Sequence, residues 1–289
     1  MSFNDDARID TGRVSRRGRN TAIGIGGGGG LLVVGLFILS QVVGFDLTGL
    51  APAIDGGQQQ QGEEVTQCDT GADADANLDC RIAGAADSLD TYWTGAADGY
   101  RSTDIVLFTD QTGTGCGGAS SAVGPFYCPA DETIYVDTAF YDELRSRFGS
   151  SGGPLAEMYV IAHEWGHHIQ NITGRMQGLD LQDTGPTSDG VRLELQADCY
   201  AGSWVGAADE IVDENGVPFL EPVTQEQIRD ALSAASAVGD DRIQQSTQGQ
   251  VNPESWTHGS SESRQKWFLA GVDGGPTACD TFAVDGAQL

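Results

Sequence analysis

His163-Glu164-Trp165-Gly166-His167 is the stretch of sequence that decides how this chain folds and what chemistry it can hold. Two histidines four residues apart project from one face of a helix, so both imidazoles can bind the same zinc ion. Glu164 is rotated toward the open side of that ion, where its carboxylate can take a proton from bound water. These five residues therefore predict a helix that carries a hydrolytic zinc centre.

The residues around this motif carry the signals of a complete helix. Pro154 suits a first helical position, and apolar side chains follow it at helical spacing. Gly174 offers a stop, because glycine readily adopts the backbone conformation that ends a helix. We therefore expect a helix from Pro154 to Asn171.

A third metal ligand is expected downstream, because a catalytic zinc takes three protein ligands and leaves one position open. The run from Ser188 to Ala208 begins with a serine cap and carries apolar residues at helical spacing. Glu194 and Asp198 lie one turn apart on it. We expect Glu194 to complete a His-His-Glu site, and Asp198 to accept the other ring N–H of a ligand, His163 by preference. The alternative is an ordinary solvated helix face.

Three segments resemble a known family. HEWGHHIQN, VRLELQADCYAG and PESWTHGSSESRQKWF are similar to segments of the bacterial putative neutral zinc metallopeptidases, membrane-anchored proteins of the zincin type. The similarity runs from about Leu89 to Phe282, and the Glu-x-x-x-Asp element also resembles the gluzincin pattern. The resemblance implies peptide hydrolysis without a defined substrate. It implies these site residues: the metal ligands His163, His167 and Glu194, the general base Glu164, and the supporting residue Asp198.

Peptide hydrolysis also needs a donor that stabilises the developing oxyanion. His258 is the best candidate, because it is the only histidine outside the helix motif and lies in a turn with serine and glycine. The alternative is a purely structural histidine. His168 directly follows His167 and points about 100° away around the helix, so it is not expected at the site.

The remaining pattern predicts an α+β fold that is mainly helical with a small β-sheet, and the resemblance implies that this domain is zincin-like. Strands are expected at Ile105 to Thr109 and at Thr133 to Asp137. The second strand is either the sheet edge that binds an extended substrate or an ordinary core strand. Further helices are expected at Ser88 to Ala97, Ala139 to Phe148, Thr224 to Val238 and Glu262 to Ala270.

The N-terminal region predicts a membrane anchor. Thr21 to Phe45 carries no charge and is long enough to cross a hydrocarbon core of about 30 Å. Five arginines precede it, and Asp46 follows it, which predicts a single-pass protein of the cell membrane with a cytoplasmic N-terminus and an extracytoplasmic domain. A cleaved signal peptide is the alternative, since Ala51-Pro52-Ala53 resembles a cleavage site. The expected division is 1–20 basic tail, 21–45 anchor, 46–82 flexible tether with a disulfide loop, and 83–289 metallopeptidase domain.

Six cysteines agree with export to an oxidising compartment. Two pairs have the same spacing, Cys68 with Cys80 and Cys116 with Cys128, and each would close a short loop. Cys199 and Cys279 would then pair and attach the Glu194 helix to the C-terminal tail. Six cysteines allow many other pairings, so this connectivity is a hypothesis.

Charge restricts the partners. The net charge of −27 would repel nucleic acid, so we expect none to bind. The expected partners are a protein or peptide substrate and, through the N-terminal helix, a membrane; the oligomeric state is not indicated. Three functions fit: a zinc endopeptidase, a zinc amidase acting on cell-wall peptides, and a silent zinc-stabilised binding or regulatory module. Glu164 favours catalysis, because a silent module has no need of a base.

Overall fold

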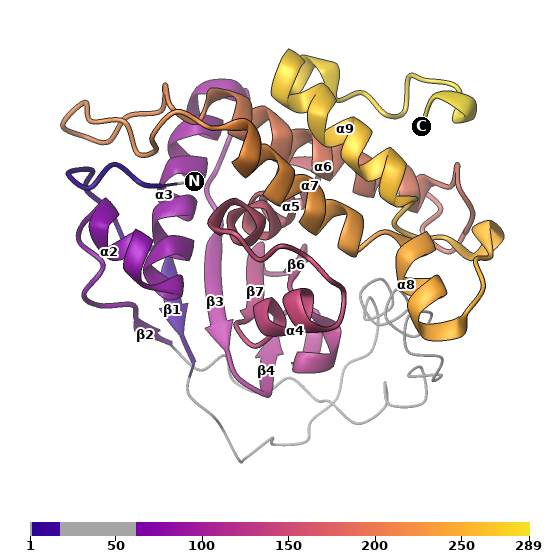
Figure 1. Cartoon of the computed structure of the whole chain (residues 1–289), viewed down its shortest axis with the longest axis horizontal. Coiled ribbons are helices and arrows are strands. Elements are labelled where there is room, and N and C mark those ends of the chain that lie inside the picture. The colour runs from indigo at the N-terminus through magenta and orange to yellow at the C-terminus, as the bar shows by residue number, and fades with distance from the viewer. Residues whose placement is uncertain (1, 18–61) are drawn as a thin grey trace.

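A mixed sheet and eight α-helices make up the part of the chain that the computed structural model describes, residues 2–17 and 62–289 (Figure 1). The sheet has the order β2-β1-β3-β7-β6, in which β1, β3 and β7 are parallel and the two outer strands antiparallel. The expected α+β class is confirmed. The strands are β1 (Val14–Arg16), β2 (Glu63–Glu64), β3 (Asp104–Phe108), β6 (Phe126–Cys128) and β7 (Thr133–Asp137), beside a hairpin of β4 (Gln111–Thr114) and β5 (Gly117–Ser120).

β7 is an internal strand, which excludes its role as a substrate-binding edge. It pairs with β3 through the register Ile105↔Ile134 and with β6 through Tyr127↔Ile134. Ile134, Tyr135 and Val136 are all fully buried, so both faces of the strand are covered. The short strand β6, which the sequence pattern did not predict, forms the edge of the described sheet on this side.

The expected helices are present, with ends that shift by a few residues in most cases. The largest difference is α3, which begins ten residues before the expected Ser88, because Asn77 caps its first turn through hydrogen bonds from Asp79 and Cys80. α2 and α8 were not expected. The helices are α2 (Gly71–Ala76), α3 (Leu78–Ala96), α4 (Phe140–Ser146), α5 (Pro154–Ile172), α6 (Asp189–Ala207), α7 (Gln225–Ala237), α8 (Asp240–Gln248) and α9 (Ser261–Gly274).

The central helix α5 packs against α6, and α6 packs against α9, so these three helices carry the site (Figure 1). The close approach of α5 to α6 and of α6 to α9 depends on glycine. A Cβ at Gly166 would lie 3.0 Å from both the Cα and the carbonyl oxygen of Ala197. A Cβ at Gly271 of α9 would lie only 1.9 Å from the carbonyl oxygen of Cys199. Any larger residue would force the helices apart.

All three predicted disulfides are confirmed. They join Cys68 to Cys80, Cys116 to Cys128, and Cys199 to Cys279, and no cysteine is free. The third bond attaches α6 to the C-terminal tail across a sequence separation of 80. It therefore fixes the position of the chain that follows α9 against the helix that carries Glu194.

The N-terminal segment is part of the same folded unit, which differs from the expected basic tail on the far side of a membrane. β1 lies between β2 and β3, with Arg16 opposite both Glu63 and Leu107. Buried side chains anchor the segment, among them Phe3 at 2% exposure and Val14 at 1%. Because residues 17 and 62 leave the sheet side by side, a single membrane crossing between them would separate strands that pair here.

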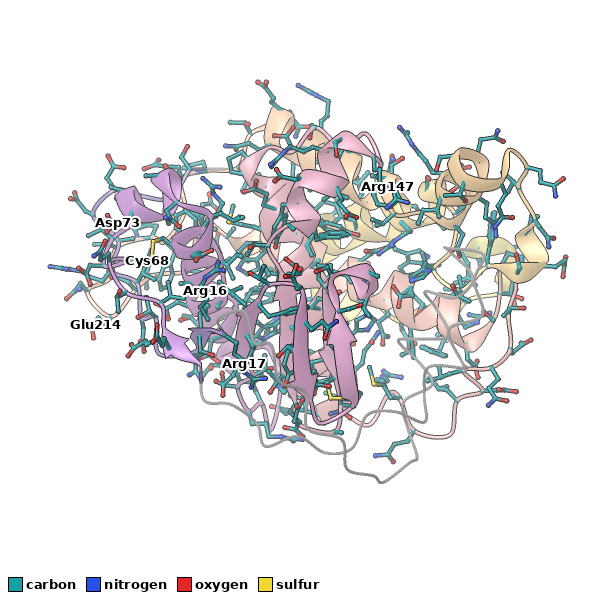
Figure 2. All side chains as sticks on the ribbon, turned by 90° about the horizontal axis from the view of Figure 1, so that it is seen from below. Arg16, Arg17, Cys68, Asp73, Arg147 and Glu214 are labelled. Carbon is teal, nitrogen blue, oxygen red and sulfur yellow. A yellow bond between two sulfur atoms is a disulfide. The ribbon has the colours of Figure 1, made fainter. Side chains whose placement is uncertain are left out.

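The N-terminal arginines have partners within the fold. Arg13 donates to Asp90 at 2.7 Å, and the Arg16 guanidinium contacts the Asp79 carboxylate. Both aspartates belong to α3. Figure 2 shows Arg16 near Cys68, and both residues line a surface pocket of about 400 Å³. Two of the five arginines that predicted a cytoplasmic N-terminus therefore form ion pairs with aspartates of α3.

The structure describes part of the expected tether but none of the expected anchor. Residues 62–82 are not a tether, because they form β2, α2 and the start of α3, and Thr70 caps α2 with a reciprocal capping box. The expected anchor, Thr21 to Phe45, lies outside the described residues. Among the residues that the structure describes, none of the helices is both long and apolar enough to cross a membrane.

Candidate metal centre

Helices α5 and α6 bring the three expected ligands together. His163 and His167 of α5 and Glu194 of α6 each offer a ligand atom, and these atoms lie within 4.8 Å of one another. Nε2 of His163 is 3.2 Å from Oε2 of Glu194, and Nε2 of His167 is 3.4 Å from Oε1. His163 and Glu194 are 7% and 8% exposed, so the group is nearly closed to solvent.

The proton positions show why this group suits a cation. Nδ1 of His163 faces Oδ1 of Asp198 at 2.9 Å, and Nδ1 of His167 faces Oε1 of Gln170 at 2.9 Å. Both Nδ1 atoms therefore donate, and each Nε2 of a neutral imidazole directs a lone pair toward the Glu194 carboxylate. Three lone-pair donors converge on one buried point. Two imidazole nitrogens and one carboxylate form a donor set that fits Zn²⁺.

Without a metal, the two imidazoles and the Glu194 carboxylate shift one another's pKa values. Burial alone would lower the pKa of His163, but the Asp198 and Glu194 carboxylates outweigh it and raise that pKa to about 10. The pKa of His167 is also raised, against burial, by Glu194. The two imidazoles in turn hold the pKa of the buried Glu194 carboxyl well below its ordinary value. A metal that binds here must displace protons, so its affinity falls with falling pH.

Asp198 is held by a buried network as well as by His163. Arg264 of α9 donates from Nε to Oδ2 at 2.7 Å and from Nη2 to Oδ1 at 2.9 Å, and the Tyr159 hydroxyl also donates to Oδ1. Asp198 is 0% exposed and Arg264 2%. Because the guanidinium fixes both carboxylate oxygens, the carboxylate that orients His163 has a single position. Sequence reasoning missed both Arg264, which lies on α9, and Tyr159, which lies on α5 one turn before His163.

Glu164 follows the first ligand on α5 and is 8% exposed. Among the described residues, no group donates a hydrogen bond to its carboxylate, whereas nearby Glu157 is paired with Arg81 and Arg145. The charge of Glu164 contributes to raising the pKa of Tyr141, although burial is the larger cause. Glu164 is therefore a largely buried residue whose carboxylate has no hydrogen-bond partner among the described residues, which suits a group that accepts protons.

His258 is organised by Asp240 at the start of α8. Oδ2 of Asp240 accepts the backbone N–H groups of Thr257, His258 and Gly259 at 2.7, 2.7 and 3.0 Å. Its Oδ1 lies 3.2 Å from Nδ1 of His258, and Nε2 of that ring has no hydrogen-bond partner among the described residues. Burial lowers the pKa of His258, but Asp240 and Glu194 raise it above the ordinary value, so the imidazole lies within electrostatic range of the ligand set. Sequence reasoning missed Asp240, which lies 18 residues away.

His168 does not belong to the ligand set. It is fully buried on the other side of α5, where Nε2 donates to the Arg101 carbonyl at 2.7 Å and Nδ1 accepts from the Tyr127 hydroxyl at 3.0 Å. Burial lowers its pKa. His168 therefore attaches α5 to β6, and it points away from the ligand set as expected.

Comparisons with known proteins agree with this geometry. The chain matches the family described as "Putative neutral zinc metallopeptidase" over residues 2–282, a range that includes β1. It is 53% identical over 225 residues to uncharacterized protein Rv2575 of Mycobacterium tuberculosis, which covers 77% of each chain. It is 36% identical over 284 residues to uncharacterized protein YpfJ of Escherichia coli K12, which covers 96% of this chain and 94% of that one. No solved structure matches the chain.

Proposed function

The chain belongs to the family of putative neutral zinc metallopeptidases, and we propose that it is a zinc-dependent endopeptidase with Glu164 as general base. The observation that carries this proposal is the convergence of His163, His167 and Glu194 on one buried point, with both Nδ1 atoms held by acceptors. A zinc amidase that acts on cell-wall peptides would use the same residues, so the bond cleaved is decided by assay.

Each polar group near the ligands has a role in this proposal. When bound, Zn²⁺ would acidify water and polarise the scissile carbonyl. The Glu164 carboxylate accepts a proton from water and passes it to the leaving amine. Asp240 accepts from Nδ1 of His258 and raises the pKa of the ring, which favours the imidazolium form, and the Nε2–H of that form stabilises the developing oxyanion. Asp198 and Arg264 keep the His163 ring in one orientation.

The substrate strand and the compartment are further parts of the proposal. β6, the sheet edge that packs against α5, is the candidate to pair with an extended peptide, because Tyr127 of this strand is hydrogen-bonded to His168 and Asn171. Three disulfides favour an extracytoplasmic location. Because β1 pairs with β3, residues 2–17 would share that compartment.

The test compares the full chain with its Glu164→Gln variant for bound zinc and for cleavage of a peptide library. The full chain is required, because a fragment that starts at residue 83 lacks β1, β2 and the first turn of α3. We expect the variant to retain zinc and to lose cleavage, while Glu226→Gln, an exposed change on α7, leaves both unaltered. Equal cleavage by Glu164→Gln would reject the assigned base. Zinc binding without cleavage by the wild type would favour the silent binding module.

A further inference from the structure

Two fully buried glutamines connect the second histidine ligand to the C-terminal disulfide. Gln170 of α5 and Gln196 of α6 are both 0% exposed. Nε2 of Gln170 donates to the Leu193 carbonyl at 2.7 Å and lies 3.3 Å from Oε1 of Gln196. Nε2 of Gln196 donates to the carbonyl of Cys279 at 2.8 Å. Buried amides are costly unless their polar atoms find partners, and here they find them in one another.

The direction of this chain of hydrogen bonds is fixed at its far end. The Cys279 carbonyl can only accept, so the Gln196 NH₂ group must face it and Oε1 of Gln196 must face Gln170. The Leu193 carbonyl likewise requires the Gln170 NH₂ group. Oε1 of Gln170 is then left for His167.

This orientation determines the tautomer of His167. Oε1 of Gln170 can only accept, so Nδ1 of His167, 2.9 Å away, must carry the ring proton. Nε2 then presents its lone pair toward Glu194 and the ligand point. His163 receives the same restriction from the charged carboxylate of Asp198, whereas His167 receives it from a neutral amide whose orientation depends on two carbonyl groups.

The position of the Cys279 carbonyl depends in turn on the disulfide. Cys279 lies in the tail after α9, and its bond to Cys199 attaches that tail to α6, one turn from Gln196. Both cysteines are buried, at 0% and 1% exposure. Without the bond, the carbonyl that orients Gln196 would be held only by the remaining contacts of the tail, among them those of Thr281 with Arg192.

We propose that Gln170 and Gln196 are positioning residues for His167, and that the Cys199–Cys279 disulfide couples the C-terminal tail to the metal affinity of the site through them. The inference rests on the proposed metal site. It makes metal binding sensitive to the oxidation state of a disulfide that touches none of the ligands. Groups that orient metal ligands change metal affinity by about 10–100-fold when they are removed.

The test measures zinc affinity of the full chain by competition with a chelating indicator. Gln170→Met keeps the length of the side chain and removes the acceptor, and we expect it to weaken zinc binding about 10–100-fold. Gln196→Met, which touches neither histidine, should weaken binding by a smaller factor. Gln244→Met is the matched control, because Gln244 is a buried glutamine of α8 whose two hydrogen bonds go to Ser255 and Asn252. It should bind zinc as the wild type does.

Two further measurements separate positioning from general loss of stability. In ¹H–¹⁵N spectra of the zinc-loaded chain, the Nδ1 proton of His167 should be protected from exchange in the wild type and in Gln244→Met, and unprotected in Gln170→Met. Replacing both Cys199 and Cys279 by alanine should lower affinity several-fold in the wild-type background and cause no further loss in the Gln196→Met background.

The outcomes distinguish the two proposals. If the wild-type chain binds no zinc, both the metal site and this inference are overturned. If the wild type binds zinc and Gln170→Met binds it equally tightly, the metal site stands and the positioning role is overturned. Equal losses from the cysteine substitutions in both backgrounds would overturn the coupling through Gln196.

Discussion

Replacing Asp240 by asparagine tests the unit that organises His258. One carboxylate oxygen accepts three consecutive backbone N–H groups, and the other faces the imidazole, so a single side chain shapes the whole turn. Asparagine has nearly the same shape, and its carbonyl oxygen can take the place of Oδ2. The substitution therefore removes a buried charge while it retains an acceptor for the three donors.

The magnitude follows from these contacts. A hydrogen bond to a charged group contributes about 1.5–3 kcal/mol to stability, and a neutral one about 0.5–1.5 kcal/mol. Each of the three bonds thus loses about 1 kcal/mol, and the free energy of unfolding should fall by about 3 kcal/mol. At about 2–4 °C per kcal/mol for domains of 150–250 residues, the melting temperature should fall by about 6–12 °C. Asp240 is 5% exposed, so solvent screens little of this loss.

His258 makes the loss depend on pH. Burial and Arg264 lower its pKa, whereas Asp240 and Glu194 raise it, with a net increase above the ordinary value. Such a group contributes stability that is fully present below its unfolded pKa of about 6.5 and is lost as the pH rises through the folded pKa. In the variant one of the two carboxylates that raise this pKa is gone and the pKa falls, so less of this stability remains at acid pH. The wild type should therefore exceed the variant by more at about pH 5.5 than at about pH 9.

The assay is urea unfolding at these two pH values, with the metal content held constant. Asp241→Asn is the matched control, because Asp241 lies in the same first turn of α8 but, among the described residues, accepts only from Ser261. It should show the same loss at both pH values. An equal loss for Asp240→Asn at about pH 5.5 and pH 9 would refute the argument that Asp240 holds His258 in its charged form.

Two further predictions concern other parts of the fold. Arg264→Met leaves the buried Asp198 carboxylate without its guanidinium, and urea titrations should show a free energy of unfolding lower by about 3–5 kcal/mol. Adding Asp198→Asn to this variant should partly relieve the loss. Strictly additive losses from the two substitutions would contradict a direct ion pair. Ser15 and Glu64 face each other across β1 and β2, so cysteines introduced at both positions should form a disulfide that non-reducing peptide mapping detects. Two free thiols at these positions would contradict the pairing of β1 with β2 and the placement of residues 2–17 in the domain.

The parts of the fold that were predicted from sequence are those with local signals. The α5 pattern predicted Pro154 to Asn171, and the helix spans Pro154–Ile172, because proline and glycine mark its ends and the apolar spacing marks its inner face. The sequence pattern assigns residues 46–82 to a flexible tether with a disulfide loop, so the start of α3 is not predicted. That start is set by the Asn77 cap and by burial of Cys80 and Ile82. Strand β1 has only three residues, too few for an alternating pattern to be recognised.

In the candidate site too, only the residues with a local sequence signal could be predicted. The spacing of His163 and His167 encodes their geometry within one helix, so their convergence follows from the sequence alone. The positions of the residues that orient those ligands do not follow from spacing within one helix. Gln170 lies three residues after His167 and could have been noticed, but its orientation depends on Leu193 and Gln196, which belong to another helix. A neutral amide has two equivalent-looking ends, and only the tertiary placement of carbonyl groups decides which end meets the histidine. The two histidine ligands thus lie one turn apart on a single helix, whereas the tautomer in which they bind is set by the packing of α5, α6 and the C-terminal tail.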